Sequence, residues 1–414
     1  MISLRNAVIN KRFHGWRIVG FSAFSQFVSM GFSIYILGIY MQPMASEFGV
    51  SPSKLGWGMS FFYLANSLVG PFVGYWIDRG KARLVMTLGA TIFALGLILM
   101  GAVTNLFFAA LVCVFLLAPG ACMLGVLPCA ALLVRWFRRR QSFAVGIAAI
   151  GISLGGFVMP PVANALMEAV GWRHSLMLLG TFIALVVIPL AWLLTVGSPK
   201  ELDQNPDGDA APVVTAQSST AATDLNSGSL LKQKTFWLLT SSVGFLSLCS
   251  IMLVTYIVPF AVAKGFSSQQ GALLISLYAG SAVLGKISIG WLGDRISKRK
   301  AMILVQLIAT VGWLFMVLLH SMPALMASAV FVGFAVGGMT PIWAALIALH
   351  FDPSAFGRVK GIMTLVMLVF LIIPGPLGGY LYDLYGSYEA GFSLIWWVLP
   401  FGLLCAIFLS EKKS

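Results

Sequence analysis

Charged residues are scarce in this chain. Asp, Glu, Lys and Arg make up 9% of its 414 residues, whereas hydrophobic residues make up 59% and the mean hydropathy is +0.94. Soluble globular domains contain about 25% charged residues, so the composition excludes an ordinary soluble protein. Most of the chain is therefore expected to lie in lipid.

Acidic residues and cysteines are also few. All 13 Asp and Glu residues lie in predicted loops, in tails or near helix ends, so we expect no carboxylate deep in the membrane to hold a cation or a proton. The five cysteines are odd in number and show no metal-ligand spacing, which predicts buried free thiols. They are Cys113, Cys122, Cys129, Cys249 and Cys405.

Signatures of enzymes are missing as well. The chain has no nucleotide-binding loop of the form G-x4-G-K-S/T, no metal cluster and no nucleophile elbow. We therefore expect a protein that is not an enzyme and that has no cofactor and no metal site.

Twelve apolar stretches are long enough to cross a membrane as helices, which takes about 20 residues each. The first follows a basic segment but is too long for a signal peptide and lacks a small-residue cleavage site, so we expect a retained helix. The predicted spans are residues 16–44, 54–78, 83–103, 106–134, 141–168, 173–195, 235–263, 268–293, 301–319, 323–350, 357–383 and 388–410.

A short motif, G-x3-D-R-x3-R, occurs at residues 74–83 and again at 290–299. Each copy follows a predicted span, where a membrane helix meets water. Two further glycine pairs repeat at almost the same offset: Gly146 with Gly361, and Gly171 with Gly386. A constant offset predicts two homologous halves with the same order of elements.

Between these halves the apolar pattern is interrupted at residues 197–233, which are rich in Asp, Ser, Thr, Ala and Pro. Such a segment predicts a flexible linker. The expected organisation is an N-terminal six-helix half over residues 1–196, the linker, and a C-terminal six-helix half over residues 234–414.

Basic residues predict the orientation, because Lys- and Arg-rich short loops stay in the cytoplasm. With both termini cytoplasmic, all but four of the 26 Lys and Arg residues lie on the cytoplasmic side; Lys54, Arg173 and Lys264 lie outside and Lys286 lies within a span. The net charge of +13 then reflects topology and anionic membrane lipid. No nucleic-acid partner is expected.

The paired motif after the second and eighth spans, the six plus six helices and the long central loop resemble the major facilitator superfamily. Within it, residues 135–156 (RWFRRRQSFAVGIAAIGISLGG) and 14–16 (HGW) are similar to monocarboxylate carriers and oxalate:formate antiporters. The resemblance implies an all-α membrane fold of twelve transmembrane helices in two pseudo-symmetric halves. It also implies alternating-access transport of a small organic anion bound between the halves.

Lys286 is the residue of greatest interest. It lies eight residues before Asp294, so about 12 Å from the cytoplasmic boundary at 1.5 Å per residue. A charge in a span costs at least about 2.5–3.5 kcal/mol on the insertion scale and indicates function. Residues three or four positions away offer no carboxylate: Ala282, Val283, Ile289 and Gly290. Lys286 therefore binds a substrate carboxylate, is neutral, or snorkels to cytoplasmic water.

The resemblance places Lys286 where many of these carriers have a substrate-binding Arg. Ala282 replaces the Asp that accompanies that Arg in proton-coupled members, which argues against proton coupling through the usual pair. Oxalate carriers have another basic residue within the eleventh span, whereas only neutral residues lie between Lys360 and Asp383. A single positive charge suits a monocarboxylate better than a dicarboxylate.

Other side chains are candidates to line the binding site with Lys286: Tyr35, Trp343, Tyr278, Tyr63 and Asn66. The alternative is that they are packing or lipid-belt aromatics and an interhelical amide. In the first span, polar side chains share an arc of about 100°, which lines the pathway or allows close helix packing: Ser22, Ser25, Gln26, Ser29, Ser33 and Tyr40. Tyr35 lies off that arc, so either Gly31 shifts the helix phase or one interpretation fails.

The charged residues of the two motifs are candidates for a gate that opens as the halves rock: Asp78, Arg79, Arg83, Asp294, Arg295 and Arg299. The alternative is that they are solvated positive-inside charges. That alternative does not explain a Gly and an acidic residue at the same spacing in both copies.

We therefore expect a carrier in an inner or plasma membrane that functions as a monomer. Its expected substrate is a small organic acid, most simply a monocarboxylate, moved by uniport, exchange or proton symport, so protons and membrane lipid are further expected partners. The alternative is a proton-driven exporter of drugs or metabolites, against which the lack of a membrane-embedded carboxylate argues.

Overall fold

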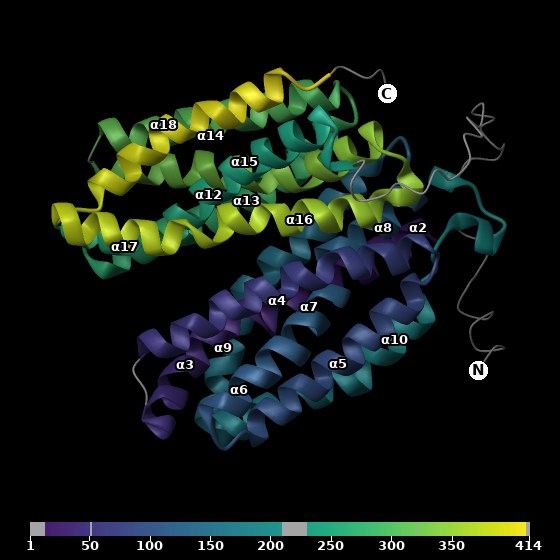
Figure 1. Ribbon diagram of the computed structural model, residues 1–414, viewed down its shortest axis with the longest axis horizontal. Helices are drawn as coiled ribbons and strands as arrows, with labels where there is room; N and C mark the ends of the chain where they lie inside the picture. The colour runs from purple at the N-terminus through teal and green to yellow at the C-terminus, as the bar shows by residue number, and fades with distance from the viewer. Residues whose placement is uncertain (1–12, 50–51, 209–229, 320, 411–414) are drawn as a thin grey trace. The chain divides into compact units, whose positions relative to one another are not determined.

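The computed structural model describes residues 13–49, 52–208, 230–319 and 321–410, and its regular elements there are all helices (Figure 1). The described residues form two compact units. The first contains the described residues up to 208 together with 351–365. The second contains 230–350 and 366–410.

The helices of the first unit follow the N-terminal half of the chain. They are α2 (Gly15–Gly31), α3 (Ile34–Phe48), α4 (Pro52–Asp78), α5 (Ala82–Ala102), α6 (Leu106–Val112), α7 (Ala118–Leu124), α8 (Val126–Trp136), α9 (Gln141–Phe182) and α10 (Ile188–Leu194). Single π-helical turns at Cys113–Leu117 and Ile183–Val187 connect α6 to α7 and α9 to α10.

The remaining helices follow the C-terminal half. They are α12 (Lys234–Ala263), α13 (Ser268–Gly293), α14 (Lys298–Leu318), α15 (Met322–His350), α16 (Phe356–Ile372), α17 (Pro374–Tyr385) and α18 (Glu389–Ile407). In the second unit, α13 packs along α15, and α14 lies against α15 and α18 (Figure 1). The first turns of α16 belong to the first unit.

Ten described segments are long and apolar enough to cross a membrane. The longest, residues 141–194, contains two of the predicted spans, which are separated at Gly171, where φ is 79°. The 27-residue α4 coincides with another predicted span. The helices of the structure thus occur along the chain in the order of the twelve predicted spans.

Three predicted spans are interrupted rather than continuous. The first breaks after Gly31 into α2 and α3, which shifts the helical phase before Tyr35. The fourth breaks at Gly125, whose ψ of −150° is not helical. The eleventh breaks before Pro374, which cannot donate a helical hydrogen bond.

Glycines with positive φ explain part of the internal repeat. Gly171 and Gly386 have φ of 79° and 66°, and each ends or kinks a helix. Gly49 and Gly265 have φ of 61° and 87° and lie 216 residues apart in sequence. Because glycine adopts this backbone conformation without steric cost, both halves keep it at the same turns.

Close helix packing in each unit depends on small residues. A Cβ added at Gly285 of α13 would overlap the carbonyl oxygen of Phe334 in α15, and one added at Gly151 of α9 would overlap that of Ala23 in α2. Such backbone-to-backbone contact is typical of membrane helices.

The polar side chains of the first span are packing groups. Ser25 donates a 2.7 Å hydrogen bond to the carbonyl of Leu124, and Ser29 a 2.8 Å bond to that of Ala121. The whole predicted arc is buried. The structure therefore supports the close-packing interpretation of this arc.

The first part of the predicted linker is folded onto the first unit. Short 3-10 helices form at Pro199–Leu202 and Pro206–Gly208. The Asp207 carboxylate accepts 2.9 Å hydrogen bonds from the backbone N–H groups of Arg138 and Arg139. Residues 209–229 of the predicted linker lie outside the described residues.

Candidate functional site

The first motif lies where α4 meets the beginning of α16. A Cβ at Gly74 would overlap the backbone of Gly357, and a Cβ at Gly361 would come within 2.6 Å of the Gly70 carbonyl oxygen. Each helix thus presents two glycines four residues apart, which lets the two backbones touch. The glycine of the motif therefore has a packing role.

Asp78 follows one turn after Gly74 and caps α16 from outside that helix. Its carboxylate accepts hydrogen bonds from the backbone N–H of Gly357 at 2.9 Å and of Arg358 at 2.7 Å. Arg135 approaches the same carboxylate at 3.4 Å. A negative charge at a helix N-terminus satisfies free N–H groups and matches the helix dipole.

The arginines of the two motifs have matching contacts. Arg79 stacks on Tyr75 at 4.2 Å from the ring centroid, and Arg295 stacks on Trp291 at 3.7 Å. The last arginine of each motif donates to a carbonyl at the end of the sixth span of its own half: Arg83 to Thr195 at 3.0 Å, and Arg299 to Ile407. Cations stabilise helix C-termini in this way.

The aspartates of the two motifs differ. Asp78 caps another helix, whereas Asp294 forms an ion pair of 3.8 Å with Lys298 on the adjoining helix α14. The sequence pattern predicts equivalent charges but not this difference, because the position of α16 next to α4 is a tertiary feature.

Lys286 lies in α13 of the second unit, immediately after Gly285, which contacts α15. Its side chain is buried, with 5% of the residue exposed. Tyr278 lies eight residues earlier on the same helix, and its hydroxyl makes a 2.5 Å hydrogen bond with Ser250 of α12. Trp343 is buried in α15.

The other predicted site residues lie in the first unit. The ring of Tyr35 lies over Gly156 of α9, where a Cβ would come within 2.8 Å of it. Tyr35 and Tyr63 lie within electrostatic range of each other. Asn66 donates a 3.2 Å hydrogen bond to the carbonyl of Ala118, as an interhelical amide would.

Lys360 is a charged residue whose environment the sequence does not reveal. The sequence places it at the cytoplasmic start of the eleventh span, but it is 2% exposed and lies inside the span Phe356–Tyr382. Its ammonium lies 5.7 Å from the ring centroid of Phe356 and within electrostatic range of Cys129 in α8. The sequence analysis places Lys286 alone within a span, but the structure buries Lys360 in a span as well.

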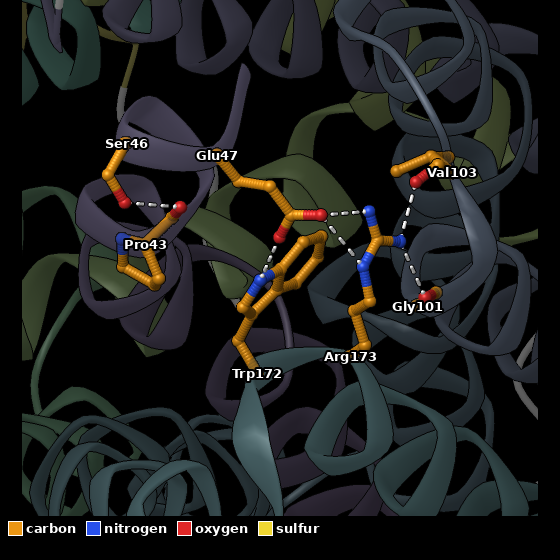
Figure 2. A network of polar contacts seen from close by, with 7 residues as sticks. All are labelled: Pro43, Ser46, Glu47, Gly101, Val103, Trp172 and Arg173. Carbon is orange, nitrogen blue, oxygen red and sulfur yellow. Dashed lines mark hydrogen bonds and ion pairs between the residues drawn. The ribbon is translucent and has the colours of Figure 1, made fainter. Parts of the chain in front are cut away.

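A polar network around Glu47 and Arg173 connects α3, α5 and α9 of the first unit (Figure 2). Arg173 pairs with Glu47 at 2.7 Å and donates to the carbonyls of Gly101 and Val103 at the end of α5. Trp172 donates a 2.8 Å hydrogen bond to the same carboxylate. Hydrogen bonds from Arg173 and Trp172 lower the pKa of Glu47 below its ordinary value. Glu47 lies beyond the predicted end of the first span at residue 44.

The described part of the chain contains no group of three His, Cys, Asp or Glu side chains that could hold a metal ion. None of the five cysteines in that part of the chain forms a disulfide bond.

Comparison with known proteins identifies the family. The sequence profile of the Major Facilitator Superfamily matches residues 23–288 and 240–412. An MFS-type transporter of Gibberella moniliformis is 26% identical over 341 residues, which cover 80% of this chain and 76% of that protein. Monocarboxylate transporter 12 of Xenopus laevis is 26% identical over 392 residues, covering 91% of this chain and 84% of the relative.

A solved structure agrees with this assignment. The fucose:proton symporter of E. coli superposes with a TM-score of 0.71 at 15% identity, covering 95% of this chain and 98% of the symporter. The symporter therefore shares the twelve-helix fold with two pseudo-symmetric halves. The family match and the similar transporters show that this fold belongs here to a membrane transporter and not to an enzyme. The chain belongs to the Major Facilitator Superfamily and resembles its monocarboxylate transporter branch.

Proposed function

We propose that this transporter carries a small organic anion, most simply a monocarboxylate, by alternating access, and that Lys286 binds the carboxylate. The observation that carries the proposal is the burial of Lys286 within a membrane-spanning helix. Burying a charged lysine at this position costs free energy, and charged residues within membrane spans usually serve a function such as binding the transported solute. The similarity to proteins named monocarboxylate transporters supports the same substrate class.

Burial supports substrate binding over snorkelling. A snorkelling lysine extends its ammonium into water, whereas Lys286 is 5% exposed. Its ammonium is a compact charge with three donors and binds one carboxylate without the fixed geometry of an arginine. A substrate with one carboxylate and an apolar remainder fits such a site.

Aromatic residues supply the apolar part of the proposed site. Tyr278 and Trp343 lie on α13 and α15, which pack along each other, and Tyr35 and Tyr63 lie near each other in the first unit. Asn66 is retained as a weaker candidate, because its amide already bonds to a backbone carbonyl. Rings of this kind pack against the hydrocarbon part of an organic acid.

We place the cytoplasmic gate at the motif residues, with Asp78 as its central group. The Asp78 carboxylate ties α4 to the first turn of α16, and separating the two helices breaks two hydrogen bonds. The adjoining helix ends are stabilised by the other charged residues of the two motifs: Arg79, Arg83, Asp294, Arg295 and Arg299.

The proposed halves are residues 1–196 and 234–414, joined by the linker 197–233, and both termini are cytoplasmic. We further propose an inner or plasma membrane location and function as a monomer in contact with anionic lipid.

A screen of small acids tests the proposal. The purified protein is melted in detergent with a panel of mono- and dicarboxylates, and the acids that raise its Tm are then tested for uptake into proteoliposomes. We expect at least one monocarboxylate to raise the Tm and to be taken up, because a ligand that binds only the folded state stabilises it. Uptake of organic cations in place of acids would contradict the proposal and favour an exporter of drugs.

A further inference from the structure

We propose that Lys360 is a second anion-binding residue, which meets the substrate only on the cytoplasmic side of the transport cycle. The inference rests on the proposed transport of an organic anion. Lys360 is one of two lysines in the described part of the chain that are 5% exposed or less, and the other is Lys286.

The burial of Lys360 depends on where α16 packs. Gly357 and Gly361, three residues before and one after Lys360, are in backbone contact with α4. Cys129, within electrostatic range of the ammonium, lies on α8. All these residues belong to the first unit. The contact of the first turns of α16 with α4 therefore helps to keep Lys360 away from water.

The same contact is held by Asp78. Its carboxylate bonds to the backbone N–H of Arg358, two residues before Lys360. If this contact is the cytoplasmic gate, opening it removes both the helix cap and the cover of Lys360. The ammonium then enters the cytoplasmic path at the moment when the substrate leaves or arrives there.

A purely structural role accounts poorly for a lysine here. Well-packed apolar side chains are commonly at least as stabilising as buried charges, because a charge loses its hydration on burial. If Lys360 is buried when the gate is closed and hydrated when it is open, its ammonium recovers that hydration free energy when the gate opens. An ammonium exposed in this way attracts anions. Lys360 would therefore bind the anion at the cytoplasmic end of its pathway.

Transport measured separately from each face tests the inference. Proteoliposomes of known orientation receive the wild type, Lys360→Met, Lys360→Arg or Lys300→Met, with radiolabelled pyruvate and benzoate as probes. Methionine has a similar length without charge, and Lys300 is an exposed lysine at the start of α14 that controls for surface charge. Loss of a bond to a charged group lowers affinity by about tenfold or more.

We expect Lys360→Met to raise the KM for substrate on the cytoplasmic face about tenfold, with the outer-face KM unchanged, and Lys360→Arg to restore most of the affinity. Lys300→Met should leave both values unchanged. Wild-type KM values on both faces in Lys360→Met, with a Tm lower than that of the wild type, would overturn the inference and indicate a structural lysine, while the proposed function would stand. Failure of the wild type to take up any acid would overturn both.

A second measurement tests exposure without a substrate. In a variant whose native cysteines are replaced, Lys360→Cys should react with a membrane-impermeant thiol reagent from the cytoplasmic face. Adding Asp78→Asn should speed that reaction several-fold, because the α16 cap is weakened. Equal reaction rates with and without Asp78→Asn would contradict the link between the gate and Lys360.

Discussion

At the scale of single residues, Lys286 offers the most direct test of the carboxylate site. Lys286→Gln should reduce uptake about 10- to 100-fold, because it removes a hydrogen bond to a charged group. The variant should still fold and reach the membrane, since it removes a buried charge rather than creating one. Lys286→Arg keeps the charge with different reach and should retain partial transport. Initial uptake rates in proteoliposomes measure both effects.

A matched control for Lys286 is Lys300→Gln, which removes an exposed lysine from the start of α14. It should transport at the wild-type rate. Wild-type substrate affinity in Lys286→Gln would contradict the carboxylate-binding role and favour snorkelling.

Glu47 predicts a pH dependence of stability. Because hydrogen bonds from Arg173 and Trp172 lower its pKa in the folded protein, the contact stabilises the fold above the ordinary pKa of 4.5. The stabilisation is lost as the pH falls through the lower, folded value. Glu47→Gln should therefore lower the Tm at pH 7, and its difference from the wild type should shrink below about pH 4.5.

Thermal melting of both proteins in detergent between pH 3.5 and 7.5 checks this expectation. Glu168→Gln changes an exposed carboxylate that bonds to Asn164 on its own helix and serves as the control. A Tm difference for Glu47→Gln that is the same at every pH would show that the network acts through packing and not through charge.

At the scale of secondary-structure elements, Asp78 predicts how firmly the first turn of α16 is held. Asp78→Asn removes the negative charge from two backbone N–H groups, and loss of such a cap costs about 0.5–2 kcal/mol. Hydrogen exchange at Gly357 and Arg358 should therefore become about tenfold faster. Mass spectrometry of exchanged peptides that cover the start of α16 measures this.

The repeated motif provides the control for Asp78. Asp294 forms an ion pair with Lys298 at the start of α14, whereas Asp78 bonds to the first turn of α16. Asp294→Asn should leave exchange at the start of α16 unchanged. Equal acceleration by both variants would mean that Asp78 acts through the general charge of the cytoplasmic surface.

Some elements of the fold could be predicted from the sequence and others could not. The spans and the repeat could be predicted because hydropathy and glycine spacing are local signals. The break of the first span after Gly31 could be anticipated only as an alternative, since glycine permits a break without requiring one. The burial of Lys360 and the cap at Asp78 could not be predicted, because both depend on α16 packing against α4.

The candidate site divides in the same way. The sequence identifies Lys286 because a charge in an apolar run is visible without a structure. It does not distinguish lining from packing residues, and only the hydrogen bonds of Asn66 and of the serines in α2 reveal packing roles. The sequence does not predict the folded segment 199–208, because its stability comes from hydrogen bonds that Asp207 accepts from the loop before α9.

At the scale of the whole molecule, the distribution of basic residues predicts the orientation of the protein in the membrane. Most of the basic residues should lie on the cytoplasmic side, because translocating short basic loops is unfavourable. Val170, which is 41% exposed between the fifth and sixth spans, should then face outside, and the exposed Lys232, before α12, should face the cytoplasm. In a variant whose native cysteines are replaced, Val170→Cys in intact cells should react with an impermeant thiol reagent, whereas Lys232→Cys should react only after permeabilisation. External labelling of Lys232→Cys would reverse the topology and move Asp78, Lys360 and the proposed gate to the outer face.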